Sequence, residues 1–219
     1  MVLKWGKVSL FFYYIYSLAF AAITYYFLAY DKVRLHSTSQ KLYALLFVLG
    51  VFAGFIMYYF TLTSLIAIAT SYDLLLSIML IIFISLAHVL LIYVAINAGI
   101  FKPKRYVPYY GISFSTGIAF VEGGSLLYII LPYTFSYLYV VALLFAGTFT
   151  MIISTSGYVI GKLVKSYKLM QSIYYPVFII SVFMLVSLPL FLKIYFLAIP
   201  STISEIFLAL MFIILSKRH

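Results

Sequence analysis

The chain has 219 residues, of which 67% are apolar and only 8% are charged, and its mean hydropathy is +1.20. Soluble domains carry about 25% charged residues, so this composition excludes an ordinary soluble domain and predicts an integral membrane protein. The formal net charge of +10 would suggest a nucleic-acid partner in a soluble protein. Here the basic residues lie in short segments between apolar runs, so we expect them to contact the bilayer and its anionic lipid headgroups, and we expect no nucleic-acid binding. The chain has no cysteine, which excludes disulfides and thiolate metal sites.

Apolar runs of about twenty residues follow one another along the chain, and we interpret residues 1–219 as a single transmembrane domain. The pattern predicts an all-α, polytopic bundle of seven transmembrane helices. Their expected ranges are 8–30, 42–62, 74–98, 109–131, 135–160, 173–192 and 194–215.

Breaks are expected at several points between and within these runs. A connector of small and hydroxyl residues is expected to lead from the second run to Asp73, which has the position of a helix-start residue. Pro103 and Pro108 are expected to stop the third helix. Pro200 interrupts the last run, and Thr202-x-x-Glu205 has the spacing of a capping box, so the regular part of this helix is expected to begin near Thr202.

The loop charges predict the orientation of the chain. Eleven of the fourteen Lys and Arg residues follow the first, third, fifth or seventh run, which all end on the same side if there are seven spans. Cytoplasmic loops carry an excess of Lys and Arg. This bias predicts a multi-pass protein of the cell membrane with its N-terminus outside and its C-terminus in the cytoplasm.

Glu122 lies in the middle of the fourth run, where a charged side chain costs about 3 kcal/mol or more and needs a partner. At about 100° per residue, small and polar residues share its side of the helix, so we expect Glu122 to face other helices. It is either a catalytic or ion-handling carboxylate, or a buried group that hydrogen-bonds a neighbouring helix.

His88 is the second candidate, deep in the third run. It either pairs with Glu122 as half of a metal site or a proton relay, or bonds to a backbone carbonyl or a hydroxyl. Zinc requires three or four ligands, and the other histidines, His36 and His219, lie in a loop and at the terminus. We therefore predict no metal site and no cofactor.

Small residues at helical spacing predict close helix contacts. Two Gly-x-x-x-Gly patterns occur, and further small residues lie on the side of Glu122. The predicted helix-contact residues are Gly50, Gly54, Gly111, Ser115, Gly117, Ala119, Ser125, Gly157 and Gly161.

The fourth run resembles a known family signature. The motif Y-G-x5-G-F-A-x-x-E-N of PrsW-type intramembrane proteases is similar to the stretch that contains Tyr110, Gly111, Gly117, Ala119 and Glu122. Downstream, Gly157-Tyr158-x-x-Gly161 is similar to the G-Y-x-x-G that follows the catalytic histidine of that family. The family is related to the CAAX-prenyl proteases and to the anterior-pharynx-defective subunit of γ-secretase, a non-catalytic scaffold with seven spans.

This chain departs from the family at the catalytic positions. The paired-glutamate motif of the family corresponds to residues 87–91, which contain His88 but no glutamate, and the later histidine corresponds approximately to Phe149. The asparagine after the glutamate is here Gly123. The resemblance therefore implies a PrsW-like fold whose hydrolytic set has lost most of its members.

These observations favour a non-catalytic membrane scaffold, a pseudoenzyme or complex subunit that assembles with or stabilises other membrane proteins. One alternative is a divergent intramembrane hydrolase in which Glu122 and His88 are catalytic. The other is a small transporter, channel or lipid-binding subunit, favoured by the interruption at Pro200 because discontinuous helices often line binding sites.

Overall fold

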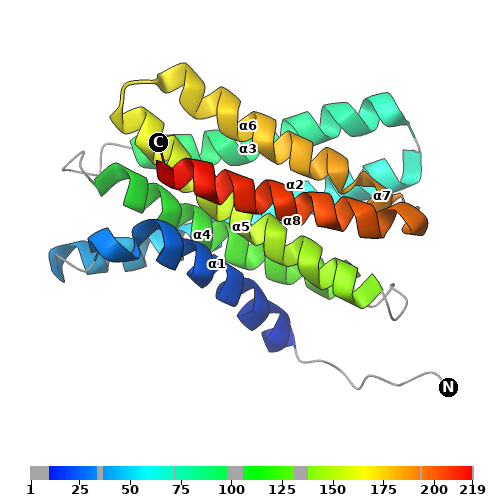
Figure 1. The fold of residues 1–219 in the computed structure, drawn as a ribbon, viewed down its shortest axis with the longest axis horizontal. Helices are drawn as coiled ribbons and strands as arrows, with labels where there is room; N and C mark the ends of the chain where they lie inside the picture. The colour runs from blue at the N-terminus through cyan, green and yellow to red at the C-terminus, as the bar shows by residue number, and fades with distance from the viewer. Residues whose placement is uncertain are drawn as a thin grey trace.

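The computed structural model describes residues 10–33, 37–71, 73–97, 106–130, 138–192 and 194–218. In these ranges the regular structure is helical throughout, which confirms the all-α prediction (Figure 1). The helices are α1 (Leu10–Val33), α2 (Ser37–Ser71), α3 (Leu74–Asn97), α4 (Val107–Ile130), α5 (Leu138–Lys165), α6 (Leu169–Val186), α7 (Leu188–Phe191) and α8 (Tyr195–Arg218).

Six of the described helices are long and apolar enough to cross a membrane, namely α1, α2, α3, α5, α6 and α8. Their outer faces carry large apolar side chains, and Phe52, Phe83 and Phe207 are each more than half exposed. A soluble monomer rarely exposes so much contiguous apolar surface, whereas a bilayer solvates it. The chain is therefore a multi-pass membrane protein, as predicted.

The helix α4 is at the centre of the bundle, and it packs most extensively against α5 and α2 and then against α1. From Val107 to Tyr128 every side chain is buried except Phe120, which is half-buried, and Tyr128, which is exposed. A helix enclosed by other helices does not face lipid, so small and polar residues can replace apolar ones. This enclosure explains how α4 can hold a glutamate and several serines although it is not among the six candidate membrane spans.

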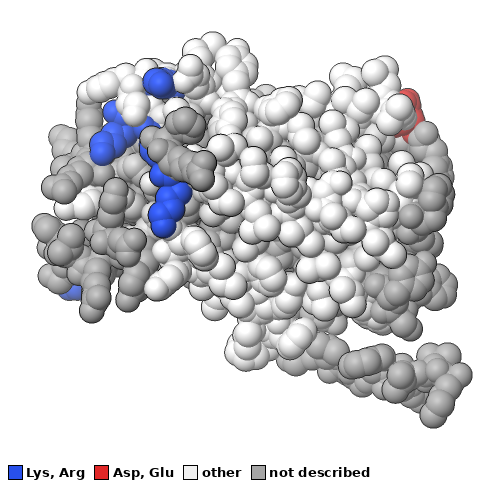
Figure 2. Space-filling view, in the orientation of Figure 1, with Lys and Arg blue, Asp and Glu red and all other residues white. Residues whose placement is uncertain are grey.

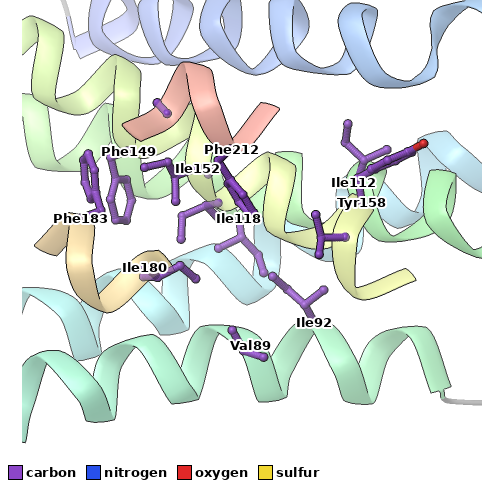
Figure 3. Packing of buried hydrophobic residues seen from close by; sticks show 14 of the residues in the cluster. Val89, Ile92, Ile112, Ile118, Phe149, Ile152, Tyr158, Ile180, Phe183 and Phe212 are labelled. Atoms are coloured by element: carbon purple, nitrogen blue, oxygen red, sulfur yellow. The ribbon is translucent and has the colours of Figure 1, made fainter. Parts of the chain in front are cut away.

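Aromatic rings bind α5 to α6 in the largest buried cluster. The Phe145 and Phe183 rings stack with centroids 5.7 Å apart, and the Phe149 ring lies 6.2 Å from that of Phe183. Figure 3 shows Phe149 beside Phe183, with Ile180 below them toward Val89 of α3. The apolar core thus includes residues of α4 itself and joins this central helix to α2, α3, α5, α6 and α8.

The second helix is longer than predicted, because the expected connector between residues 63 and 73 is helical as far as Ser71. The Thr63 and Thr70 hydroxyls each donate to carbonyls three and four residues earlier in their own helix. Hydroxyl residues that bond in this way are compatible with a continuing helix. At about 1.5 Å per residue, the 35 residues of α2 exceed the roughly 30 Å of a bilayer core.

The prediction that the last helix begins near Thr202 is wrong. The helix α8 begins at Tyr195 and contains Pro200. The Thr202 hydroxyl donates back to the Ala198 carbonyl at 2.8 Å, so it does not cap a helix start. Pro200 lies early in the helix, where one lost backbone hydrogen bond leaves the rest of the helix intact.

Two other prolines lie in the first turn of a helix. The run 173–192 is divided into α6 and α7 at Ser187, with Pro189 in the first turn of α7. Pro108 does not end the third helix but lies in the first turn of α4. Backbone N–H groups in a first turn have no acceptor within the helix, so the N–H that proline lacks costs no hydrogen bond there. The third helix ends at Asn97, and Pro103 lies outside the described residues.

Asp73 begins α3 as predicted, with its Oδ1 accepting from the backbone N–H groups of Leu75 at 2.8 Å and Leu76 at 3.3 Å. We expect Asp73→Ala to lower the free energy of unfolding by about 1 kcal/mol, because two N–H groups lose their acceptor. Equilibrium unfolding in detergent measures this change. Asp73→Asn is the control and is expected to stay close to wild type, and equal losses in both variants would contradict a capping role.

Candidate functional site

Three polar side chains from three helices meet in the middle of the bundle. Glu122 of α4 places Oε2 2.6 Å from Nε2 of His88 on α3, and its Oε1 accepts from the Thr61 hydroxyl of α2 at 2.8 Å. The His88 Nδ1 lies 2.9 Å from the carbonyl oxygen of Ile84, one turn earlier in α3. The two candidates from the sequence are therefore direct partners, and we call Thr61, His88 and Glu122 the polar triad.

The hydrogen bonds determine how many protons the polar triad holds. The Ile84 carbonyl can only accept, so the His88 Nδ1 that faces it carries a hydrogen. The short contact between Nε2 and Oε2 requires one more hydrogen, located on either atom. In both arrangements the His88–Glu122 pair has no net charge, which avoids the large cost of an isolated charge inside a membrane.

The polar triad is closed to water. Thr61, His88 and Glu122 each have an exposed fraction of 0%, so no surface of these side chains can be touched by a water molecule. The Phe149 ring packs nearly perpendicular to the His88 ring, with centroids 6.2 Å apart. In the described part of the chain no third His, Cys, Asp or Glu joins this pair, and His36 and His219 lie outside it. The site is a dry, fully paired polar contact between α2, α3 and α4.

Further hydrogen bonds connect α4 to its neighbours at other levels. Ser113 donates to the Tyr43 carbonyl of α2 at 2.7 Å, and Ser115 donates to the Ser154 carbonyl of α5 at 3.0 Å. On the side of α1, the Ala119 carbonyl accepts from Ser17, and the Ser125 hydroxyl bonds to the Tyr14 hydroxyl at 2.9 Å. The predicted small and polar side of α4 therefore contacts several helices.

The predicted glycines lie where helix backbones approach each other. A Cβ added at Gly50 would meet the Phe114 carbonyl of α4, and one at Gly117 would meet the Phe47 carbonyl of α2. Gly111 and Gly157 face each other across α4 and α5 in the same way. A Cβ added at Gly54 would lie 3.0 Å from Ile118 Cα, and one at Gly161 would lie 2.6 Å from Pro108 Cα.

The hydroxyl residues of α5 bond chiefly within their own helix. Thr148, Thr155 and Ser156 each donate to a carbonyl one turn earlier. Thr150 does the same, and its oxygen also lies 3.1 Å from the Ser17 hydroxyl of α1. The carbonyls one turn earlier in α5 are the nearest acceptors for these hydroxyls, so most of them do not join α5 to other helices.

A second buried carboxyl, Glu205, lies in α8 with an exposed fraction of 1%. It lies beside the Ser187 hydroxyl at the break between α6 and α7. Its Oε2 has no hydrogen-bond partner, while Ser187 donates to the Phe183 carbonyl at 2.8 Å. The predicted capping role is wrong, and Glu205 is an incompletely paired acid within a candidate membrane-spanning helix.

We expect Glu205→Met to raise the free energy of unfolding by about 1–2 kcal/mol, because it removes a buried polar group that lacks a full set of partners. The Ser187 hydroxyl keeps its bond to Phe183, so no donor is left unpaired. Equilibrium unfolding of both proteins in the same detergent measures the difference. Destabilisation by Glu205→Met would show that the carboxyl makes a stabilising contact.

The sequence did not predict Thr61 as a partner of Glu122, or Ser187 as a neighbour of Glu205. Thr61 is one hydroxyl in an apolar run, and no local pattern connects it to a glutamate 61 positions later. The contact of Glu205 with Ser187 depends on the break before α7, which the unbroken expected range 173–192 did not include. The only signal in the sequence was the acid itself. An acid within an apolar run implies a partner on another helix but does not identify that partner.

Comparisons with protein-family models, with curated proteins and with solved structures found no match to this chain. The function is therefore inferred from the fold and from the geometry of the polar triad.

Proposed function

We propose that the chain is a non-catalytic, multi-pass membrane scaffold or complex subunit. The observation that carries this proposal is the closure of the polar triad, whose three side chains expose no surface to water. A hydrolase must place a water molecule beside its general base. Here the positions around Glu122 are taken by His88 and Thr61, so the carboxyl acts as a bond between helices.

The arrangement of α4 supports the same proposal. Its backbone is in close contact with α2 through Gly50 and Gly117 and with α5 through Gly111 and Gly157. Contacts of this kind fix the relative positions of helices and leave the outer faces of the bundle for lipid or other subunits. We propose other membrane proteins as the partners, with the outer faces as the contact surface.

The PrsW-like character of the chain is part of the proposal. The resemblance implies a histidine near position 149, and the Phe149 ring packs against His88. A histidine at this position would lie beside the His88–Glu122 pair. We therefore propose a family-like site in which an apolar ring replaces a catalytic group and excludes water.

We propose seven spans, with α4 as the span enclosed by the other six. The described Lys and Arg side chains gather at one end of the bundle, and the acidic surface visible in this view lies at the opposite end (Figure 2). The loop-charge bias then places the basic end, with the C-terminus, in the cytoplasm and the N-terminus outside the cell membrane.

The alternative of an intramembrane hydrolase is favoured by one observation, the 2.6 Å contact between His88 and Glu122. This alternative requires the bundle to open so that water reaches the pair. The transporter alternative loses its main support, because α8 is continuous through Pro200.

Extraction of the full chain from native membranes into lipid nanodiscs, followed by native mass spectrometry, tests the proposed function. We expect a second membrane polypeptide at a fixed ratio to the chain in independent preparations. The Glu122→Gln variant is expected to retain it, because glutamine can keep both hydrogen bonds of the pair. A lone, monodisperse chain under these mild conditions would contradict a scaffold function.

A further inference from the structure

A pocket opens at the basic end of the bundle, where α5, α6 and α8 come together. Its volume is about 330 Å³, within the range of about 300–1,000 Å³ that is typical of small-molecule sites. Lys162, Lys168 and Gln171 supply polar side chains to its lining, and Leu163, Tyr175 and Leu215 supply apolar surface. None of the residues that line this described pocket is acidic. The lining is therefore cationic on one side and apolar on the other.

Lys162 is fixed in position on the α5 side of the pocket. Its Nζ donates to the Ser216 carbonyl in the last turn of α8 at 3.1 Å and lies 5.7 Å from the centre of the Tyr158 ring. Such contacts hold the ammonium group at a defined place instead of leaving it to move in solvent. A fixed ammonium at the wall of a pocket is a typical partner of a phosphate group.

The turn between α5 and α6 places the other two polar residues. Tyr167 adopts a left-handed backbone conformation with φ 59°, and Lys168 N donates to the Leu163 carbonyl at 2.9 Å, which reverses the chain after α5. The helix α6 then begins after Lys168 with no side-chain cap. Its first N–H groups carry the partial positive charge of a helix N-terminus, next to Lys168 and Gln171.

We propose that this pocket binds the phosphate group of an anionic phospholipid. The phosphate is held between Lys162 and Lys168 near the start of α6, and an acyl chain follows the apolar side formed by Leu163 and Leu215. The location agrees with this ligand, because the pocket lies at the end of membrane-spanning helices, at the level of lipid headgroups. A soluble phosphate ester has the same charged group but does not use the apolar side.

The test uses the purified full chain in nanodiscs of phosphatidylcholine, titrated with phosphatidylglycerol and read by native mass spectrometry. Lys168→Ala is expected to weaken phosphatidylglycerol binding about fivefold, the effect of removing one lysine contact to an anionic lipid. Lys165→Ala is the matched control, because it removes the same charge at the end of α5 from a residue outside the pocket lining. Both lysines are exposed, so neither change should affect unfolding.

Each outcome of this test decides the proposal. A selective loss in Lys168→Ala, with inorganic phosphate failing to compete, assigns the pocket to a lipid. Equal losses in both variants would mean that the basic surface attracts anionic lipid through its overall charge. This result would overturn the proposal that the pocket binds the lipid. Competition by inorganic phosphate at concentrations similar to those of the lipid would assign the pocket to a soluble phosphate ligand. This result would overturn the proposal of a lipid ligand. Equal binding of phosphatidylglycerol and phosphatidylcholine would overturn the proposal entirely.

Discussion

Replacement of His88 by leucine is expected to lower the free energy of unfolding by about 3–5 kcal/mol, the typical cost of removing one partner from a buried, hydrogen-bonded pair. Leucine is similar in size to histidine, so the loss reflects the unpaired Glu122 carboxyl and not an empty cavity. Glu122 keeps only the Thr61 hydroxyl in this variant. Equilibrium unfolding in a fixed detergent mixture, followed by helical circular dichroism, measures the change.

Two further variants test whether the loss of stability in His88→Leu comes from the unpaired Glu122 carboxyl. In Glu122→Gln the amide oxygen can accept from Thr61 while the amide nitrogen donates to His88 Nε2, so we expect a loss of about 1 kcal/mol or less. The double variant His88→Leu with Glu122→Leu removes both buried polar groups and is expected to be more stable than His88→Leu alone. A loss below about 1 kcal/mol in His88→Leu would contradict a stabilising role of the polar triad.

Replacement of Gly117 by alanine is expected to destabilise the protein by about 3 kcal/mol or more, at or above the upper end of ordinary overpacking. The new Cβ would meet backbone atoms of α2, with Val51 N at 2.7 Å and the Gly50 carbonyl carbon at 2.8 Å. Backbone atoms cannot rotate away, so α2 and α4 must separate along their contact. Thermal unfolding in detergent shows this as a lower midpoint temperature.

Gly147→Ala provides the matched control for this prediction. A Cβ at Gly147 meets the ring of Phe20, with its nearest atoms at 2.9 Å, and a ring at the end of a side chain can move. Both changes replace a helix-interior glycine with alanine, so both gain about 1 kcal/mol in helix propensity. We expect Gly147→Ala to stay close to wild type. Equal stability of the two variants would show that α2 and α4 do not depend on their backbone contact.

Much of the helix arrangement could be predicted from the sequence, because long apolar runs must form helices in a membrane. The expected range 74–98 differs from α3 by one residue, and 109–131 differs from α4 by at most two residues at each end. The errors occurred where local rules were overridden by the surrounding chain. Pro200 predicted a break, but its place early in α8 allowed the helix to continue.

The candidate site could be predicted only in part. Glu122 and His88 were identified because ionisable groups are rare and costly within a membrane. Whether they meet depends on the rotation of α3 against α4, which the sequence does not encode in any local pattern. Thr61 was missed for the same reason, because a single threonine in an apolar run has many possible acceptors, including its own helix.

The Glu122→Gln variant provides the most direct measurement of whether the polar triad joins helices or performs chemistry. Glutamine keeps the hydrogen bonds to His88 and Thr61 but cannot act as an acid, a base or a nucleophile. We predict that complexes purified from native membranes contain the same partner in the same amount for wild type and Glu122→Gln, and less of it for His88→Leu. Loss of the complex in Glu122→Gln, with its unfolding unchanged, would contradict a non-catalytic scaffold.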